Sequence, residues 1–347
     1  MTSADPRFAS SRSLRPHRRA LLLAGLGLLG AGVPAFGSSE TPERPIVRRS
    51  GIAFGTTVSI AVVDDGRPRA EIEAAFDAAF AAIRAVQKAA DLFDPGSEIS
   101  RLNRDGRVVA PSADLVALVD HGVRLATASG GAFDPTVQPI WEAWRDAGGR
   151  PETAALVAAR ARVDHRAVRL STEEIGFARP GMAMTLNALA QGHAADRVAA
   201  VLGARGITDA FVDTGEFGVR GSHPSGRDWR VAVARPHRRD LVVGRISVAD
   251  ARFVATSADD RTYWTPDFSE HHIVEPWSGH SPRSLAEVVV SARSGLVADG
   301  LSTALMVTGF GEIGRRLLAE EPAAGALAVA KGGEITIHGA FPAVEPS

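Results

Sequence analysis

The stretch Gly51-Ile-Ala-Phe-Gly-Thr-Thr-Val-Ser-Ile-Ala-Val-Val63 is rich in β-branched residues and predicts a strand, which Asp64-Asp65-Gly66 would end. Residues 71–90 then predict an amphipathic helix, because large apolar residues recur at steps of three and four positions. Those residues are Ile72, Phe76, Phe80, Ile83 and Val86. A stripe of this kind is typical of a helix face that packs on a core.

The rest of the chain continues with strands and helices in no regular alternation. Apolar periodicity predicts helices at residues 113–128, 153–162, 193–205, 297–308 and 312–320. Alternating or continuous apolar runs predict strands at residues 211–213, 229–233, 285–291, 326–330 and 334–341. The segment that contains Trp141 and Trp144 is expected to be a loop. This order favours an α+β fold over a doubly wound sheet.

Composition excludes several classes of protein. The 347 residues are 45% hydrophobic and 23% charged, which is ordinary for a globular chain and excludes disorder over most of its length. The formal net charge of −1 excludes a strongly basic nucleic-acid footprint, so no nucleic-acid partner is expected. Nearly all the cationic residues are arginine, and the lysines are Lys88 and Lys331.

The chain contains no cysteine. Disulfides, thiolate metal sites, cysteine nucleophiles and an acylated N-terminal cysteine are therefore excluded, and the protein is not expected to be a lipoprotein.

The N-terminus has the layout of an export signal. A polar, basic segment ends at His17-Arg18-Arg19, and a Gly-rich apolar run follows from Ala20 to Val33. That run is short for a membrane span, which needs about 20 residues. Paired arginines favour the twin-arginine route, with an ordinary secretory signal as the alternative. We therefore expect a signal at residues 1–37, a lead-in at 38–50, a domain at 51–342 and a periplasmic location.

Two pairs of polar residues suggest metal chemistry. Asp299 and Thr303 stand four positions apart in a predicted helix, so both side chains share one face, and a carboxylate with a hydroxyl suits Mg²⁺. The alternative is an aspartate favoured by the helix dipole and a threonine bonded to its own backbone. His271 and His272 could bind zinc, but no third ligand at a suitable spacing supports such a site.

Six polar segments, taken in order, resemble the ApbE family, the FAD:protein FMN transferases. The resemblance covers about residues 51–320, and it implies an α+β fold with a mixed sheet and flanking helices. Its segments are Phe54-Gly55-Thr56-Thr57, Asp94-Pro95-x-Ser97-Glu98-Ile99-Ser100-Arg101-Leu102-Asn103, Gly130-Gly131-Ala132-Phe133-Asp134-Pro135-Thr136, Ala255-Thr256-Ser257, His272-Ile273-x-x-Pro276 and Ala298-Asp299-x-x-x-Thr303-Ala304-Leu305.

The resemblance implies a Mg²⁺-assisted reaction that splits FAD at its pyrophosphate, attaches FMN to a Thr or Ser of an acceptor protein and releases AMP. By carry-over, the side chains of Asp299 and Thr303 and the carbonyl of Ala190 would ligate Mg²⁺. His272 matches a histidine near the reacting phosphate and would be the base for the acceptor hydroxyl.

The FAD site follows from the same resemblance. Phe93 matches an aromatic residue that borders the flavin, and Thr256 and Ser257 match a segment that lines the FAD site. Ala190 and Gly192 lie where a helix begins, and a glycine there can let backbone N–H groups approach phosphate.

Several positions depart from the family pattern. The departures are Thr185, Asn187, Gln191 for a lysine, Phe217 for an aspartate, Glu275 for an aspartate and Trp277 for an arginine. Together with the twin-arginine signal they resemble the NosX-like branch. Such members serve nitrous oxide reductase maturation by flavinylating a membrane electron donor, which implies a NosR-like acceptor.

The sequence leaves two alternatives open. One is a Mg²⁺-dependent FAD pyrophosphatase, in which water replaces the acceptor hydroxyl. The other is a flavin-binding accessory protein whose chemistry has decayed.

Overall fold

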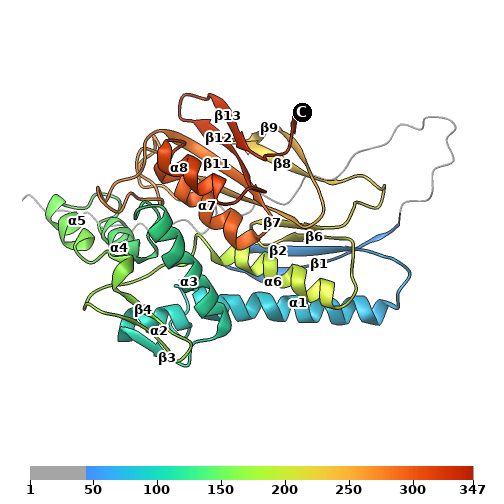
Figure 1. Cartoon of the computed structure of the whole chain (residues 1–347), viewed down its shortest axis with the longest axis horizontal. Coiled ribbons are helices and arrows are strands. Elements are labelled where there is room, and N and C mark those ends of the chain that lie inside the picture. Colours follow the sequence, from blue (N-terminus) through green and yellow to red (C-terminus); the bar gives the residue numbers. More distant parts are fainter. Residues whose placement is uncertain (1–43, 347) are drawn as a thin grey trace, which may run out of the picture. The chain divides into compact units, whose positions relative to one another are not determined.

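The computed structural model describes residues 44–346, which fold around an eight-stranded sheet (Figure 1). Its strand order is β1-β2-β6-β7-β10-β11-β12-β13, and every neighbouring pair is antiparallel. The strands are β1 (Ile46–Ala53), β2 (Thr56–Val63), β6 (Ala210–Asp213), β7 (Phe217–Arg220), β10 (Arg252–Ala258), β11 (Leu285–Ala292), β12 (Gly325–Ala330) and β13 (Ile335–Gly339). The predicted α+β class is confirmed.

The first two strands form a hairpin, so the prediction of one strand over residues 51–63 is wrong. Phe54 and Gly55 separate β1 from β2, and both have positive φ, 51° and 72°. Two left-handed residues in a two-residue loop match the twist of antiparallel strands. The first strand begins at Ile46. The predicted signal at residues 1–37 lies outside the described residues.

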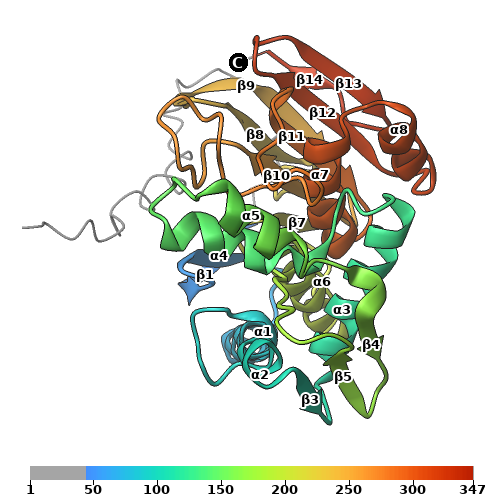
Figure 2. The same cartoon turned by 90° about the vertical axis from the view of Figure 1, so that its left-hand side faces the viewer.

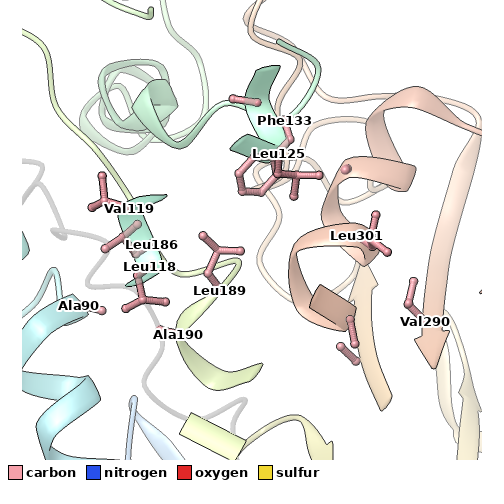
Figure 3. Packing of buried hydrophobic residues seen from close by; sticks show 14 of the residues in the cluster. Ala90, Leu118, Val119, Leu125, Phe133, Leu186, Leu189, Ala190, Val290 and Leu301 are labelled. Atoms are coloured by element: carbon pink, nitrogen blue, oxygen red, sulfur yellow. The ribbon is translucent and has the colours of Figure 1, made fainter. Parts of the chain in front are cut away.

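Helices cover one face of this sheet. The amphipathic helix predicted at 71–90 is confirmed as α1, which packs along α6, and α6 packs along α7. Leu189 and Ala190, where α6 begins, lie in the same core as Leu118 of α3 and Leu301 of α7 (Figure 3). The helices are α1 (Arg69–Ala90), α2 (Glu98–Asp105), α3 (Ala113–Ala128), α4 (Gln138–Asp146), α5 (Thr153–Arg160), α6 (Ala190–Ala204), α7 (Gly295–Thr308) and α8 (Glu312–Ala319).

A second sheet covers part of the opposite face. It has the order β14-β9-β8, with β8 at Trp229–Arg235, β9 at Arg238–Val248 and β14 at Val344–Glu345. Trp229, Val231 and Ile246 pack with Val254 and Val289 of the central sheet in one buried cluster. The central sheet is therefore apolar on both faces.

The loop expected around Trp141 and Trp144 is instead helix α4, which packs with α5. Pro139 stands in the first turn of α4, where its missing N–H breaks no helical hydrogen bond. Ile140 and Trp144 are buried on one face, and the Trp144 indole donates to the Gly279 carbonyl over 2.8 Å. Tertiary packing, which local sequence does not reveal, supports this helix.

A small sheet of order β3-β5-β4 lies beside α2 and α3 (Figure 2). Its strands are β3 (Arg107–Val109), β4 (Val168–Leu170) and β5 (Glu174–Phe177). Ser97 caps α2, since its side chain accepts from the Ser100 N–H over 3.1 Å. Within residues 44–346, no helix is both long and apolar enough to cross a membrane.

Candidate active site

Helices α6 and α7 meet backbone to backbone at two glycines. A Cβ on Gly192 would lie 2.1 Å from the Gly295 carbonyl oxygen, and a Cβ on Gly295 would lie 2.3 Å from the Gly192 oxygen. Any larger residue would push the helices apart. This close approach brings Asp299, one turn beyond Gly295, against the first turn of α6.

Asp299 is buried and faces that first turn. The Gly192 N–H donates to its Oδ2 over 3.0 Å, as suits a carboxylate near a helix N-terminus. This glycine was expected to let backbone N–H groups approach phosphate, and its own N–H is directed at Asp299 instead. Burial raises the pKa of Asp299 to about 7, against the effect of the Gly192 hydrogen bond. A carboxylate in this position is stabilised by a bound cation.

Glu216 places a second buried carboxylate in the same region. Its Oε2 accepts from the Thr256 N–H over 2.9 Å. Burial raises its pKa well above the ordinary value, and the nearby Asp299 carboxylate raises it further. Two buried carboxylates that repel each other favour a cation or a shared proton between them.

Glu216 is a site residue that the sequence did not predict, because the family pattern places its aspartate at position 217, where this chain has Phe217. Phe217 opens β7, and its ring packs 5.7 Å from that of Phe211, in the cluster that faces the second sheet. A carboxylate is nevertheless present one residue earlier. The polar run Asp213-Thr-Gly-Glu216 was the available signal.

Hydroxyl groups join β10 to α7 beside these carboxylates. The Ser257 hydroxyl is 2.9 Å from that of Thr303 and 2.7 Å from that of Ser302. Ser302 in turn donates to the Asp299 carbonyl over 2.8 Å. The structure therefore brings together four predicted site residues, namely Thr256, Ser257, Asp299 and Thr303.

The start of α6 adjoins the turn that carries Glu216. The Thr214 hydroxyl donates to the Gln191 carbonyl over 2.8 Å. A Cβ on Gly215 would lie 2.1 Å from Nε2 of Gln191, so this side chain lies directly against the turn. Ala190, the first residue of α6, is buried in the same region.

The donor set fits Mg²⁺. Carboxylate, hydroxyl and carbonyl oxygens are the ligands of hard cations. The Asp299 and Glu216 carboxylates, the Thr303 hydroxyl and the Ala190 carbonyl are the residues that could hold the ion.

His272 is held by one backbone carbonyl through both its backbone and its ring. Its backbone N–H and its Nδ1 both reach the Thr262 carbonyl, over 2.9 and 3.0 Å. Because a carbonyl only accepts, Nδ1 carries the proton and Nε2 keeps a free lone pair. Burial lowers the pKa of His272, so the ring is neutral at pH 7.

His271 differs from its neighbour. It is fully buried, and burial lowers its pKa to about 3. Within residues 44–346, no three His, Cys, Asp or Glu side chains are grouped to hold a metal ion, so the zinc alternative at His271 and His272 finds no ligand set.

Two other positions lie at the surface. Phe93 follows α1 and is 80% exposed. None of the hydrogen bonds among residues 44–346 joins it to the carboxylate region. Trp277 is 52% exposed, while Glu275 accepts from the Ser278 hydroxyl over 2.8 Å.

Comparison with known proteins identifies the class. The model of the ApbE family matches residues 54–328, so the chain belongs to the ApbE family. The FAD:protein FMN transferase of Haemophilus influenzae is 27% identical over 283 residues, 77% of this chain and 82% of the relative. The FAD:protein FMN transferase of Rhodobacter capsulatus is 31% identical over 308 residues, 84% of this chain and 57% of the relative.

Solved structures agree with this assignment. The flavin transferase ApbE of Vibrio cholerae matches with a TM-score of 0.74 and 26% identity, over 86% of this chain and 98% of that one. The apo form of the Pseudomonas stutzeri flavinyl transferase ApbE matches with a TM-score of 0.73 and 28% identity, over 86% and 96%. The predicted resemblance is confirmed.

Proposed function

We propose that this chain is an FAD:protein FMN transferase that attaches FMN through a phosphoester to a Thr or Ser of an acceptor protein and releases AMP. Its relatives carry that name. The observation that carries the proposal is the cluster in which α6, β10 and α7 bring Asp299, Thr303, Thr256 and Ser257 together.

His272 supplies the base in this proposal. Nε2 accepts the proton of the acceptor hydroxyl as the hydroxyl oxygen attacks the phosphorus of the FMN half of FAD. The bond from that phosphorus to the bridging oxygen breaks, and AMP leaves with this oxygen. The Thr262 carbonyl stabilises the imidazolium, since it accepts the Nδ1 proton.

Asp299, Thr303, Ala190 and Glu216 would hold Mg²⁺. When bound, the ion neutralises charge on the pyrophosphate oxygens and on the departing phosphate. Thr256 and Ser257 lie beside this region on β10 and would contact FAD. The exposed Phe93, in the segment that follows α1, would border the flavin.

The location and the acceptor belong to the same proposal. The paired Arg18 and Arg19 before a short apolar run support twin-arginine export to the periplasm. A NosR-like membrane protein would be the acceptor. Replacement of both arginines by lysine should abolish the periplasmic fraction of the protein, and an unchanged fraction would exclude the twin-arginine route.

Product analysis separates this proposal from the alternatives. The protein is incubated with FAD and Mg²⁺, with and without an acceptor domain that carries a flavinylation threonine. A transferase releases AMP in step with FMN bound to the acceptor. Release of AMP and free FMN in equal amounts in the absence of the acceptor would indicate a pyrophosphatase. Binding of FAD with no release of AMP would indicate an accessory protein.

A further inference from the structure

Residues 259–284, between β10 and β11, carry His272 and contain no helix or strand. We propose that Arg239 and Lys331, which lie outside this segment, are positioning residues that fix the Thr262 carbonyl and thereby select the tautomer of His272. The proposal rests on the proposed function for the role of His272. The tautomer of the His272 ring can be measured whether or not the proposed function holds.

Arg239 of β9 fastens the beginning of the segment. Its Nε donates to Oδ2 of Asp260 over 2.8 Å, and a second guanidinium nitrogen donates to the other carboxylate oxygen. The third nitrogen bonds Glu287 of β11. The planar guanidinium therefore grips Asp260 in a two-point geometry, which lysine could not reproduce. Both acidic side chains are almost completely buried.

Lys331 fastens the same segment eight positions further on. Its Nζ donates to the Phe268 carbonyl over 2.6 Å and lies 3.4 Å from Oδ2 of Asp259. Phe268 has a positive φ of 57°, a conformation that persists in a non-glycine residue only where its surroundings enforce it. His237 adds a stacked ring at 4.3 Å from Phe268 and a hydrogen bond to Asp259 over 2.7 Å.

These two anchors bracket Thr262. Asp260 is two residues before it, and Phe268 packs edge-on against Tyr263, the next residue, at 4.7 Å. Tyr263 forms a β-bridge with His271, which holds the two arms of the segment in register. The Thr262 carbonyl can therefore accept both the N–H and the Nδ1–H of His272 only while both arms stay in place.

A purely stabilising role does not account for this network. Buried ion pairs contribute little net stability, because desolvation offsets much of the attraction, whereas they can specify a unique arrangement. Here Arg239 of β9 and Lys331 in the turn after β12 both hold this one loop, and Glu287 of β11 in turn holds Arg239. The arrangement they specify determines which ring nitrogen of His272 carries the proton.

The test is ¹⁵N NMR of histidine-labelled full-length protein without FAD, with His272→Asn used to assign the His272 signals. The wild type should show one neutral tautomer with the proton on Nδ1. Arg239→Gln and Lys331→Gln should each give a mixture of tautomers. Arg238→Gln, which breaks an exposed ion pair with Asp240 on the same strand, is the matched control and should keep the wild-type signal.

Kinetics provide the second measurement. Loss of an anchor should lower kcat for transfer by roughly 10- to 100-fold, in the range that displacement of a catalytic group produces. KM for FAD should stay within about twofold, because the interactions that bind FAD equally well in the ground state and in the transition state are unchanged. Circular dichroism checks that each variant is folded. If Arg239→Gln does not fold, Lys331→Gln tests the proposal.

A folded variant with the wild-type tautomer would overturn the positioning role. If the wild type itself transfers no FMN, the proposed function fails. The NMR result would still show whether the two anchors set the ring.

Discussion

The N–H of Gly192 donates to Oδ2 of Asp299 over 3.0 Å, and this bond ties the first turn of α6 to α7 at the centre of the candidate site. It exists because Gly192 and Gly295 let the two backbones touch. The same contact that packs the helices thus places a buried carboxylate beside Glu216, Thr303 and Ser257.

Substitution of Gly192 by alanine should be strongly destabilising. The new Cβ would meet the Gly295 carbonyl at 2.1 Å, and backbone cannot rotate away as a side chain can. We expect a loss of at least about 1–3 kcal/mol in the free energy of unfolding, the usual range for overpacking. Urea denaturation measures it. Gly332→Ala is the control, because a Cβ added there would meet no atom within 4 Å apart from those of its chain neighbours. Equal losses of stability in the two variants would contradict the packing account.

Binding of Mg²⁺ should strengthen as pH rises from about 6 to 8. The pKa of Asp299 is raised to about 7 in the metal-free protein, so below that pH a proton competes with the ion. Calorimetric titration with Mg²⁺ at both pH values should show the tighter binding at pH 8. Asp299→Asn should remove most of the binding and reduce this dependence, to which the raised pKa of Glu216 also contributes. A variant that keeps the wild-type affinity and pH dependence would place the metal elsewhere.

The same raised pKa predicts a change in stability without metal. A carboxyl group whose folded-state pKa lies above its unfolded value contributes stability at low pH that is lost as pH rises towards 7. Asp299→Asn should therefore reduce the fall in unfolding free energy between about pH 4 and 7 without removing it, because burial also raises the pKa of Glu287 to about 7 and raises that of Glu216. Chemical denaturation in a chelator, with wild type beside the variant, measures it. A slope equal to that of the wild type would mean that Asp299 does not contribute to it.

Substitution of His272 by asparagine should slow transfer by about 10²–10⁴, the span of general acid–base catalysis, with little change in FAD affinity. His271→Asn is the matched comparison. That ring is fully buried, so its loss should lower the melting temperature rather than the rate of chemistry. Equal losses of kcat in the two folded variants would show that the wrong histidine carries the role.

The substitution Gln191→Lys tests whether the lysine of the family pattern would strengthen FAD binding in this chain. The Gln191 amide lies against Gly215, beside the turn that carries Glu216, so a lysine there would add charge close to the expected phosphates. Charge-assisted hydrogen bonds are roughly twice as strong as neutral ones, and we expect a few-fold tighter FAD binding that fades with salt. Fluorescence titration at two salt concentrations measures it, with Gln191→Met as the uncharged control. Tighter binding in both variants would exclude the charge argument.

Periodicity in the sequence was sufficient to predict most helices and strands, because each buries a regular apolar face: Ile72 and Phe76 in α1 are examples. It could not reveal the turn at Phe54, where a non-glycine residue adopts positive φ. Nor could it reveal α4, whose support comes from Gly279, a residue 135 positions away from Trp144.

The site was predictable only in part, because some of its residues depend on contacts between elements that are distant in the sequence. Asp299, Thr303 and Ser257 belong to motifs that can be recognised along the chain. The Glu216 carboxylate becomes significant only when the turn before β7 folds against β10 and the start of α6. The anchors Arg239 and Lys331 act through partners in other elements, and neither lies in a recognisable motif.

The most direct test of FMN transfer is the intact mass of an acceptor domain incubated with the full-length protein, FAD and Mg²⁺, beside the same domain with its flavinylation threonine changed to valine. The proposed function predicts that the threonine form gains the mass of one FMN less water and fluoresces on a denaturing gel, while the valine form stays unmodified. An unmodified threonine form, in reactions where FAD is bound or hydrolysed, would contradict it.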